Sequence, residues 1–372
     1  MNDGDSNDRE WLARLGRTAL PVLSLLSLAA GLGATLAVAG DTLGYDFLAY
    51  HQAAVRLLDG LPLYDMSYTQ TGGFGLFYYP PTFAPMLLPF GLLSPTTATW
   101  IWIGLSVVAF LVGVAILPAS RSVRWWLVLL AGWSFPFVYA VKLGQVGPLL
   151  FLVFAVGWRC LGQPIGFGVA AAIGVAVKLQ PVLLIVWALC KRRFRAVFVS
   201  LVTLAALSIA ATILAGPAAW TDFLTLIRTV SEPITTAHNF TPGAVAYQLG
   251  LDAASGAIVQ AVNVVGVAIV FLASIRWSTE EASYLVAVIA TQLVSPILWD
   301  HYAMLLLLPV AYLLSAGRWW ALVIPLVTAW PLVGITPPAA YPIVFWIALL
   351  GTFLVGLQAR DPRQSLAEMM AA

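Results

Sequence analysis

Ionisable side chains are rare in this sequence, and two of them follow apolar stretches at positions where they could do chemistry. Asp46 comes soon after the first apolar run, and Lys178 follows a run of Gly, Ala, Val and Ile. A carboxylate at the first position either caps the helix that begins there or acts as a general base at a membrane surface. An ammonium group at the second either extends to the membrane interface or binds a phosphate.

Three further positions allow both a structural and a functional interpretation. Gln145 lies between two short apolar stretches next to a glycine, where it is an ordinary turn residue or a hydrogen-bond donor to a ligand. Asp300 and His301 separate two apolar runs, and they form either a structural pair or part of a site. His238 and Asn239 lie in a longer polar loop, where a solvent-exposed surface is the alternative to ligand binding.

The composition identifies the kind of element that must position these residues. Of 372 residues, 61% are hydrophobic and only 9% are charged, against about 25% charged residues in a soluble protein. This excludes a soluble enzyme, a disordered chain, a nucleic-acid binder and a disulfide scaffold. Cys160 and Cys190 lack metal-type spacing, and the net charge of +2 indicates no polyanionic partner. The composition therefore predicts an all-α polytopic membrane protein.

Apolar runs separated by short polar or basic turns predict about 12 membrane spans. The run at 18–40 ends in an Ala-x-Ala sequence typical of signal-peptide cleavage, but it is longer than the roughly 7–15 apolar residues of such a peptide. We therefore expect it to be the first, uncleaved span. The predicted spans cover residues 18–40, 97–117, 125–141, 147–160, 165–179, 181–190, 196–216, 255–275, 282–298, 302–316, 319–335 and 341–358.

The basic residues indicate the orientation of these spans. If residues 1–17 and 359–372 are cytoplasmic tails, 14 of the 18 basic residues fall on the cytoplasmic side, and the remaining four are Arg56, Lys142, Lys178 and Arg228. Such a bias is expected for cytoplasmic loops. We expect a single membrane domain over residues 1–372, with both termini in the cytoplasm.

The segment 41–94 differs from an ordinary outer loop. Residues 45–60 have helical periodicity, with Phe47, Tyr50, Ala54, Leu57 and Leu58 on one side, which predicts an amphipathic helix at the outer surface. The following apolar segment, 77–93, contains four prolines, which oppose a regular spanning helix. We expect it to be re-entrant or interfacial.

This orientation collects most of the unusual polar residues on the outer side. Side chains from six or more segments, including all three histidines, indicate one outward-facing cavity. The outer carboxylates Asp46 and Asp300 could share a cation, although nothing in the sequence requires a metal or another cofactor. The outer set is Asp46, His51, Lys142, Gln145, Lys178, Gln180, His238, Asn239, Asp300 and His301.

Common nucleotide and hydrolase motifs are absent from the sequence. It contains no Walker motif, no His-Glu-x-x-His and no Gly-x-Ser-x-Gly. An enzyme with an outer site would also lack nucleotide donors. A lipid-linked donor is the natural substitute, because its tail can lie between the helices.

Three blocks of motifs occur in order on the outer side, and together they resemble glycosyltransferase family 87 of the GT-C superfamily of membrane glycosyltransferases, over about residues 41–316. The first block contains an aspartate followed by Gly-x-Pro-Leu-Tyr and Tyr-Pro-Pro sequences, the second a Gly-Gln pair and a lysine before proline, and the third a Ser-Pro-x-x-Trp-Asp-His sequence. The blocks are Asp46-Phe47-x-x-Tyr50 with Gly60-x-Pro62-Leu63-Tyr64-Asp65 and Tyr79-Pro80-Pro81; Gly144-Gln145 with Lys178-x-x-Pro181; and Ser295-Pro296-x-x-Trp299-Asp300-His301-Tyr302.

The resemblance implies a polyprenol-phosphate-mannose-dependent mannosyltransferase, or a close relative that transfers another hexose. It implies a GT-C-type fold, a polyprenyl-phosphate-mannose donor, a glycolipid or glycan acceptor, and a location in the bacterial inner membrane with the active site outside. The best-known members add α-1,2-mannose to mycobacterial phosphatidylinositol mannosides and lipoarabinomannan. Asp46 matches the catalytic aspartate of the family, and Gln145, Lys178 and His301 match its other motif positions.

The expected reaction is a single-step inverting transfer in which Asp46 accepts the proton of the acceptor hydroxyl. The donor phosphate and sugar are expected to contact Lys178, His301, Gln145, Asn239 and His238. The acceptor or sugar is expected to contact Tyr45, Tyr50, His51, Tyr79 and Asp300. An interfacial aromatic belt is the alternative for the tyrosines.

A transporter or flippase is the main alternative function. That class usually shows internal repeats and polar residues near the middle of the membrane, and neither is evident here. An aminosugar or arabinose transferase of the same superfamily and a non-catalytic scaffold are further alternatives. Substitution of Asp46 separates an enzyme from a scaffold.

Overall fold

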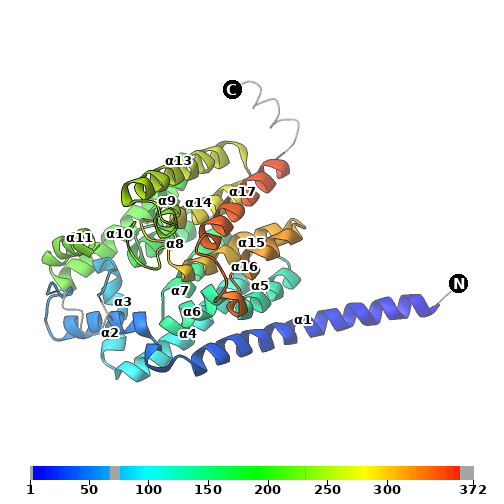
Figure 1. Cartoon of the computed structure of the whole chain (residues 1–372), viewed down its shortest axis with the longest axis horizontal. Helices are drawn as coiled ribbons and strands as arrows, with labels where there is room; N and C mark the ends of the chain where they lie inside the picture. Colours follow the sequence, from blue (N-terminus) through cyan, green and yellow to red (C-terminus); the bar gives the residue numbers. More distant parts are fainter. Residues whose placement is uncertain (1–2, 68–75, 231, 361–372) are drawn as a thin grey trace.

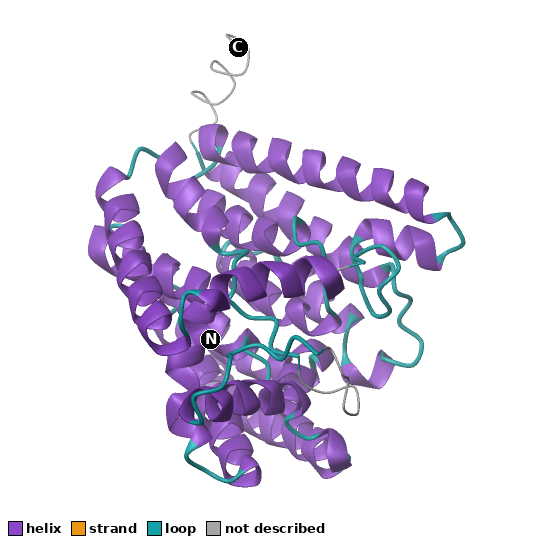
Figure 2. Cartoon of the chain, turned by 90° about the vertical axis from the view of Figure 1, so that its left-hand side faces the viewer, coloured by secondary structure: helices purple, strands orange, loops and turns teal. Residues whose placement is uncertain are grey.

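The computed structural model describes residues 3–67, 76–230 and 232–360, and the regular structure within these ranges is helical. Figure 2 shows helices joined by loops, and the described ranges contain no strand beyond one isolated bridge between Ser134 and Ala329. The α-helices are α1 (Asp3–Ala37), α2 (Tyr45–Leu58), α3 (Ala84–Gly91), α4 (Pro95–Ile116), α5 (Arg121–Trp133), α6 (Phe135–Leu143), α7 (Gly147–Arg159), α8 (Pro164–Val177), α9 (Val182–Cys190), α10 (Phe194–Ala215), α11 (Ala218–Val230), α12 (Pro242–Gln248), α13 (Ala253–Trp277), α14 (Glu280–Leu293), α15 (Leu307–Ser315), α16 (Val323–Val327) and α17 (Ala340–Ala359). The 3₁₀ helices are η1 (Gly40–Thr42), η2 (Pro81–Phe83), η3 (Asp300–Leu306), η4 (Trp319–Leu322) and η5 (Trp330–Leu332).

Five helices of the described chain are long and apolar enough to cross a membrane: residues Thr18–Ala37 of α1, and α4, α10, α13 and α17. A sixth candidate is the pair α6 and α7, which is bent by 116° at a short break. The exposed faces of the long helices are apolar, as Ile213 and Ile258 illustrate with 77% and 65% exposure. Large exposed aliphatic faces suit contact with lipid. The chain is therefore an integral membrane protein.

The predicted count of about 12 spans is not confirmed, because several predicted spans are short or broken helices. The predicted span 125–141 is divided at Ser134, where α5 ends and α6 begins. The predicted span 319–335 is divided into η4, α16 and η5. This region contains Pro325 and Pro331, which lack the amide hydrogen that a continuous helix needs. The segments Pro164–Val177 and Asp300–Ser315 are apolar but shorter than a straight span.

Helix α14 lies at the centre of the packing. All of its residues from Ala282 to Leu293 are buried, as expected for a helix that is surrounded by protein. It packs against α9, α13 and α17, and the strongly buried η3 and α15 follow it in the chain. The core of the protein is thus built around the stretch that leads from α14 to the Asp300-His301 pair.

Helix α1 lies along α5 and extends beyond the other helices (Figure 1). The hydroxyls of Ser24 and Ser27 donate hydrogen bonds to the carbonyls of Trp125 and Leu129, both at 2.8 Å. Small polar residues often join helices in this way within membranes. The helix begins at Asp3 rather than near residue 18, so most of the predicted N-terminal tail is part of α1. The predicted C-terminal tail beyond residue 360 lies outside the described residues.

The segment after α1 forms a helix where the amphipathic helix was predicted, and its described part contains no spanning helix. Helix α2 buries Phe47, Tyr50 and Ala54, whereas Leu58 is 44% exposed. The proline-rich stretch forms η2 and α3, and α3 is only 8 residues long. Helix α3 packs against α2, and both lie with α11 at one end of the molecule (Figure 1). Residues 68–75 of the predicted outer segment lie outside the described residues.

Several basic residues meet at the start of α14, whereas the outer polar residues lie beyond its other end. Arg193 forms an ion pair with Glu280 in the first turn of α14. Lys191 donates to the carbonyl of Ile275 at 2.8 Å, close to the end of α13. Because α14 has 14 residues and a helix rises 1.5 Å per residue, roughly 20 Å separates its two ends.

Candidate active site

Asp46 lies in the first turn of α2, and the start of this helix is attached to the end of α6. Gly44 precedes the helix in a left-handed conformation, and its amide donates to the carbonyl of Lys142 at 2.8 Å. The backbone amides of a first helical turn favour a carboxylate. Asp46 is therefore held near the C-terminal end of α6.

The turn after α6 brings an amide side chain to this carboxylate. Gly144 has a φ of +70°, and a Cβ at this position would lie 2.5 Å from the Cβ of Phe47. Its carbonyl accepts a hydrogen bond of 2.8 Å from the indole of Trp102. Only glycine fits this close, left-handed turn. The next residue, Gln145, donates from Nε2 to Oδ2 of Asp46 at 2.6 Å.

Two buried tyrosines hold the other end of the Gln145 amide. The hydroxyl of Tyr79 donates to Oε1 of Gln145 at 3.0 Å, and the hydroxyl of Tyr50 donates to that of Tyr79 at 2.7 Å. Tyr50 and Tyr79 are 1% and 9% exposed. These residues come from α2, from the loop before η2, and from the α6–α7 turn, so the contact links three separate segments.

A lysine and a tyrosine form the next part of the cluster. Lys178 follows the last residue of α8 in extended backbone, and Pro181 prevents α8 from continuing through this break. Its Nζ donates to the hydroxyl of Tyr302 and lies 5.9 Å from the ring centroid of Tyr79. The cation therefore lies among aromatic rings.

Gln180 connects the same break to the segment that follows α14. Its Nε2 donates to the hydroxyl of Ser295 at 2.6 Å, and this hydroxyl donates to the carbonyl of Ile297 at 2.6 Å. The Oε1 atom of Gln180 is buried and has no hydrogen-bond partner within the described residues. It is an unused acceptor beside Lys178.

Asp300 and His301 complete the cluster at the start of η3. The amide of His301 donates to Oδ1 of Asp300 at 2.6 Å, and its Nδ1 lies 3.3 Å from the same oxygen. His301 is 4% exposed, and its Nε2 is buried without a partner in the described part of the chain. A buried, unpaired ring nitrogen is costly unless a ligand pairs with it.

The local environment changes the acidity of Asp46, which lies outside the candidate spans. Burial raises the pKa of this carboxyl above its ordinary value, and nearby Asp300 adds to the increase. His301, the hydrogen bond from Gln145 and the charge of Lys178 oppose the increase. These partners come from three segments besides α2, so Asp46 lies at the meeting point of the cluster.

The model of glycosyltransferase family 87 matches residues 77–298, which is more than half of the chain. The chain belongs to glycosyltransferase family 87. It is also 29% identical, over 237 residues, to a polyprenol-phosphate-mannose-dependent alpha-(1-2)-phosphatidylinositol mannoside mannosyltransferase of Mycobacterium tuberculosis. This match covers 56% of the chain and 54% of the relative, so the chain spans about half the length of that relative.

No solved structure matches the chain, so the GT-C-type fold stays a prediction. The matched region of the family 87 model includes Gln145 and Lys178 but ends before Asp300 and begins after Asp46. The relation of Asp46 and His301 to the cluster therefore rests on the geometry of this chain.

The structure of this family 87 member brings together seven of the residues singled out from the sequence. Asp46, Gln145, Tyr50 and Tyr79 share a hydrogen-bonded chain. Lys178, Asp300 and His301 influence the pKa of Asp46, so these seven side chains form one cluster. We call this set the Asp46 cluster: Asp46, Tyr50, Tyr79, Gln145, Lys178, Asp300 and His301.

Asn239 has a different position from the one expected of a ligand-binding amide. Its Nδ2 donates to the carbonyls of Pro233 and Pro296 at 2.6 and 3.0 Å. Its Oδ1 accepts from the amides of Thr241 and Leu298 at 3.0 and 2.9 Å. The side chain is fully buried, and all these bonds are to the backbone. It joins the 233–241 loop to the segment after α14.

The remaining predicted residues lie outside the hydrogen-bonded chain. His238 is exposed and has a φ of 58°. His51 is buried on the opposite side of α2, where its Nε2 lies 3.0 Å from the carbonyl of Leu93. Tyr45 is half-buried beside Asp46 in the sequence. For these three residues, contact with a sugar or acceptor stays a prediction.

Two residues of the cluster's surroundings were given no role in the predicted site, although Gln180 belongs to the outer polar set and Tyr302 to the third motif block. Tyr302 contacts Lys178, and Gln180 offers the unused acceptor. Both are adjacent in sequence to predicted residues, since Tyr302 follows His301 and Gln180 comes two residues after Lys178. That proximity is the signal that could have identified them. Within the described residues, no group of three or more His, Cys, Asp or Glu is arranged to hold a metal ion.

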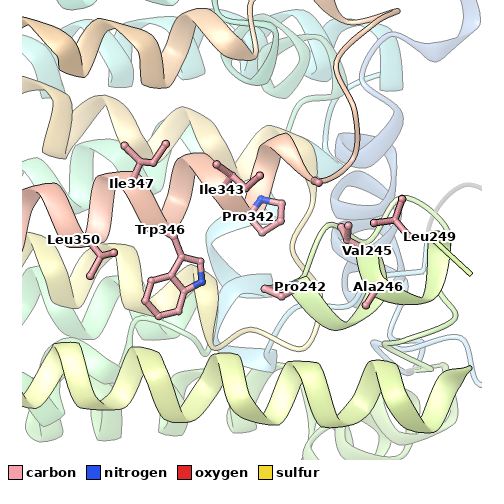
Figure 3. A pocket seen from close by; sticks show the side chains of 10 residues that line it. Pro242, Val245, Ala246, Leu249, Pro342, Ile343, Trp346, Ile347 and Leu350 are labelled. Atoms are coloured by element: carbon pink, nitrogen blue, oxygen red, sulfur yellow. The ribbon is translucent and has the colours of Figure 1, made fainter. Parts of the chain in front are cut away.

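A separate apolar pocket of about 480 Å³ lies between α12 and α17 (Figure 3). Its lining includes Pro242, Leu249, Pro342 and Trp346 and contains no ionisable residue. It offers no group that could take up a proton or stabilise a charge. This pocket therefore carries no candidate chemistry of its own.

Proposed function

We propose that this family 87 member transfers a hexose, most simply mannose, from a polyprenyl-phosphate donor to a hydroxyl of a glycolipid or glycan. The observation that supports it best is the Asp46 cluster, in which a partly buried carboxylate lies near a lysine and a buried histidine. A mannosyltransferase relative that depends on polyprenol-phosphate-mannose supports the donor class. We propose the bacterial inner membrane as its location, with the cluster outside.

In this proposal Asp46 is the general base. One carboxylate oxygen, Oδ2, accepts the hydrogen bond from Gln145, which leaves Oδ1 for the acceptor hydroxyl. As the acceptor oxygen forms its bond to the anomeric carbon, its proton moves to Asp46 and the bond to the phosphate oxygen breaks. Attack from the face opposite the phosphate inverts the anomeric centre. General-base help of this kind contributes roughly 10²–10⁴-fold.

The leaving polyprenyl phosphate needs positive charge and hydrogen-bond donors. Lys178 supplies a cation at the break between α8 and α9. His301 is held by Asp300 on one side and has a free Nε2 on the other, which can donate to a phosphate oxygen when the ring is protonated. Preorganised charge in a site that excludes water stabilises the developing phosphate more strongly than water does.

Substitution of Asp46 tests the proposed reaction. The purified protein in lipid nanodiscs is incubated with polyprenyl-phosphate-mannose and extracted bacterial glycolipids, and mannosylated product is measured. We expect D46N to lower kcat by roughly 10²–10⁴-fold, because asparagine cannot accept the proton. D59N is the matched control, since Asp59 is an exposed carboxylate at the end of the same helix.

The outcomes separate the proposed steps. Normal transfer by D46N rules out Asp46 as the base. If the protein transfers a pentose or glucose from a polyprenyl-phosphate donor but does not transfer mannose, the proposed sugar is wrong and the proposed mechanism stands. Transfer from GDP-mannose without a lipid donor contradicts the proposed donor class. Passage of a lipid-linked sugar across the bilayer with no new glycosidic bond supports a flippase instead.

A further inference from the structure

The amide of Gln145 has a defined orientation because its oxygen has two tyrosine neighbours. Oε1 lies 3.0 Å from the hydroxyl of Tyr79 and 3.4 Å from that of Tyr50. Each of these hydroxyls can donate to the amide oxygen, and the Asp46 carboxylate, which only accepts when ionised, requires the NH₂ group. The oxygen therefore faces the tyrosines, and the NH₂ group faces Asp46.

The hydrogen bonds run in one direction, toward the carboxylate. Tyr50 donates to Tyr79 at 2.7 Å, Tyr79 donates to Gln145 at 3.0 Å, and Gln145 donates to Asp46 at 2.6 Å. A chain of this kind polarises each successive donor. Gln145 thus gives a fixed hydrogen bond to one oxygen of Asp46 and leaves the other oxygen unoccupied by the described residues.

This arrangement also determines which substrate atoms Gln145 can reach. An amide has two N–H donors and one carbonyl acceptor. The carbonyl is used by Tyr79, and one N–H is used by Asp46. A side chain that is engaged at both ends is poorly suited to bind the donor phosphate, which was its expected role.

We propose that Gln145 is a positioning residue for Asp46, and that Tyr79 sets the orientation of its amide so that the acceptor hydroxyl meets a single free carboxylate oxygen. This inference rests on the proposed function, because it requires Asp46 to accept a proton. It assigns Gln145 and Tyr79 a role through Asp46 rather than contact with the donor.

The titration of Asp46 depends on Gln145 and on the other groups that face the carboxyl. The hydrogen bond from Gln145 lowers the pKa of Asp46, against the larger effect of burial. Loss of that hydrogen bond therefore moves the acidic limb of the pH–rate profile to higher pH, because the base stays protonated over a wider range. The groups that share the environment of Asp46 are Lys142 and Tyr139 of α6, Tyr50 of α2, Tyr79, Lys178, and Asp300, His301 and Tyr302 of η3.

Three substitutions in the nanodisc transfer assay test the proposal. Q145L removes the donor, and Q145E places a second carboxylate against Asp46. We expect both to move the acidic limb upward, Q145E by about one pH unit or more, since two adjacent carboxylates resist ionising together. Y79F frees the amide to rotate, and we expect it to lower kcat roughly tenfold with KM for the donor unchanged within about twofold.

Y64F is the matched control for Y79F. Tyr64 is a buried tyrosine of the same aromatic cluster, and its hydroxyl donates to the backbone carbonyl of Tyr79 at 2.7 Å. Y64F removes a buried hydrogen bond of similar length. The bonds that connect Tyr50, Tyr79, Gln145 and Asp46 remain. We expect Y64F to change thermal stability and to leave the pH profile and kcat near those of the wild type.

Two results overturn the proposal, and both differ from failure of the proposed function. A rise in KM for the donor in Q145L, with an unchanged acidic limb, makes Gln145 a substrate ligand. Equal effects of Y79F and Y64F on kcat make the tyrosine contacts structural only. Both readings require that D46N is inactive. If D46N is active, the general-base assignment itself fails, whatever the Gln145 variants do.

Discussion

At the scale of single residues, the type of a polar side chain did not by itself reveal its role. Asn239 and Gln145 are both amides on the predicted outer side, but Asn239 binds four backbone groups and Gln145 binds a carboxylate. His51 and His301 are both buried, yet His51 faces a backbone carbonyl and His301 retains an unpaired nitrogen. The partner that each side chain meets decides its role.

The pH dependence of transfer follows from the environment of Asp46. Burial raises the pKa of this carboxyl above its ordinary value, and a general base works only when it is deprotonated. We therefore expect kcat/KM to fall as the pH drops through this raised pKa, and so at higher pH than for an exposed aspartate. A pH–rate profile measured from pH 4 to 8 in nanodiscs checks this.

A control separates titration of Asp46 from acid unfolding. The far-UV circular dichroism of the protein over the same pH range reports its helices. A fall in kcat/KM that coincides with loss of helical signal, or an acidic limb in the range of an exposed aspartate, contradicts the prediction.

Asn239 is expected to contribute mainly to stability. N239A leaves the backbone groups of Pro233, Pro296, Thr241 and Leu298 without these partners, and Thr241 and Leu298 are buried. Each unsatisfied group is costly, and we expect a destabilisation of about 2–4 kcal/mol. Thermal unfolding of the detergent-solubilised protein measures the effect.

The neighbouring exposed residue provides a control for that experiment. His238 is exposed, so H238A should change the Tm little. An N239A protein with a normal Tm but a strongly raised KM for the donor would instead favour the ligand-binding role that the sequence suggested.

At the scale of elements, the breaks between helices position the candidate chemistry. Gln145 lies between α6 and α7, which are bent by 116°, Lys178 lies between α8 and α9, and Asp300 follows α14. A residue inside a long apolar helix has its backbone groups paired and its side chain among helices or lipid. At a break, a polar side chain can turn toward the others, and therefore the site depends on several short helices meeting at one place.

The α6–α7 turn is open to a direct steric test. Alanine at Gly144 would need a strained φ of +70° and would place a Cβ 2.5 Å from that of Phe47. We expect G144A to lower kcat by roughly 10–100-fold, because even a 1 Å displacement of a positioning group is costly. The measurement is kcat together with the acidic limb of the pH profile.

Gly60 provides a control for backbone strain alone. It has a similar φ of +68°, but no atom lies within 4 Å of the position of its Cβ. G60A should therefore lose only the stability associated with the left-handed conformation, about 1–2 kcal/mol. Equal losses of kcat in G144A and G60A would show that the close approach to Phe47 does not matter.

At the scale of the whole molecule, two kinds of polar residue occupy opposite ends of the buried helix α14. The first end carries the ion pair of Arg193 with Glu280, and the segment beyond the other end carries Ser295, Asp300 and His301. Since loops rich in Lys and Arg favour the cytoplasm, this separation is the one expected if the Asp46 cluster faces outward.

Thiol labelling of cells that express the protein tests this orientation. Cys190 is exposed and lies next to Lys191 at the basic end, whereas His238 is exposed in the loop joined to the segment after α14. We expect a membrane-impermeant maleimide to label H238C in spheroplasts, and to label Cys190 only after the membrane is permeabilised. The H238C protein carries C190A and C160A, so that one thiol is read at a time.

The opposite labelling pattern would reverse the orientation. If Cys190 reacts in intact spheroplasts and H238C does not, the cluster faces the cytoplasm and a donor that is available there must be considered. A cysteine-free variant reports non-specific labelling in each case.

Composition and periodicity in the sequence were sufficient for the membrane class, the amphipathic helix α2 and the absence of a spanning helix in the described part of segment 77–93. These properties depend on local physics: apolar length, a period near 3.6 residues, and proline without an amide hydrogen. The family motifs in the sequence also identified the glycosyltransferase family that the comparison shows.

The tertiary structure alone decided which polar residues meet. Asp46 and Gln145 are 99 residues apart in the sequence, and Lys178 and Tyr302 are 124 apart. Such contacts depend on how helices of slightly different length pack, and no local pattern encodes that packing. The same reason explains why apolar runs at 125–141 and 319–335 were expected to be regular spans but are divided. Hydrophobicity places a segment in the membrane or the core, whereas its partners determine where the helix breaks and which side chain faces Asp46.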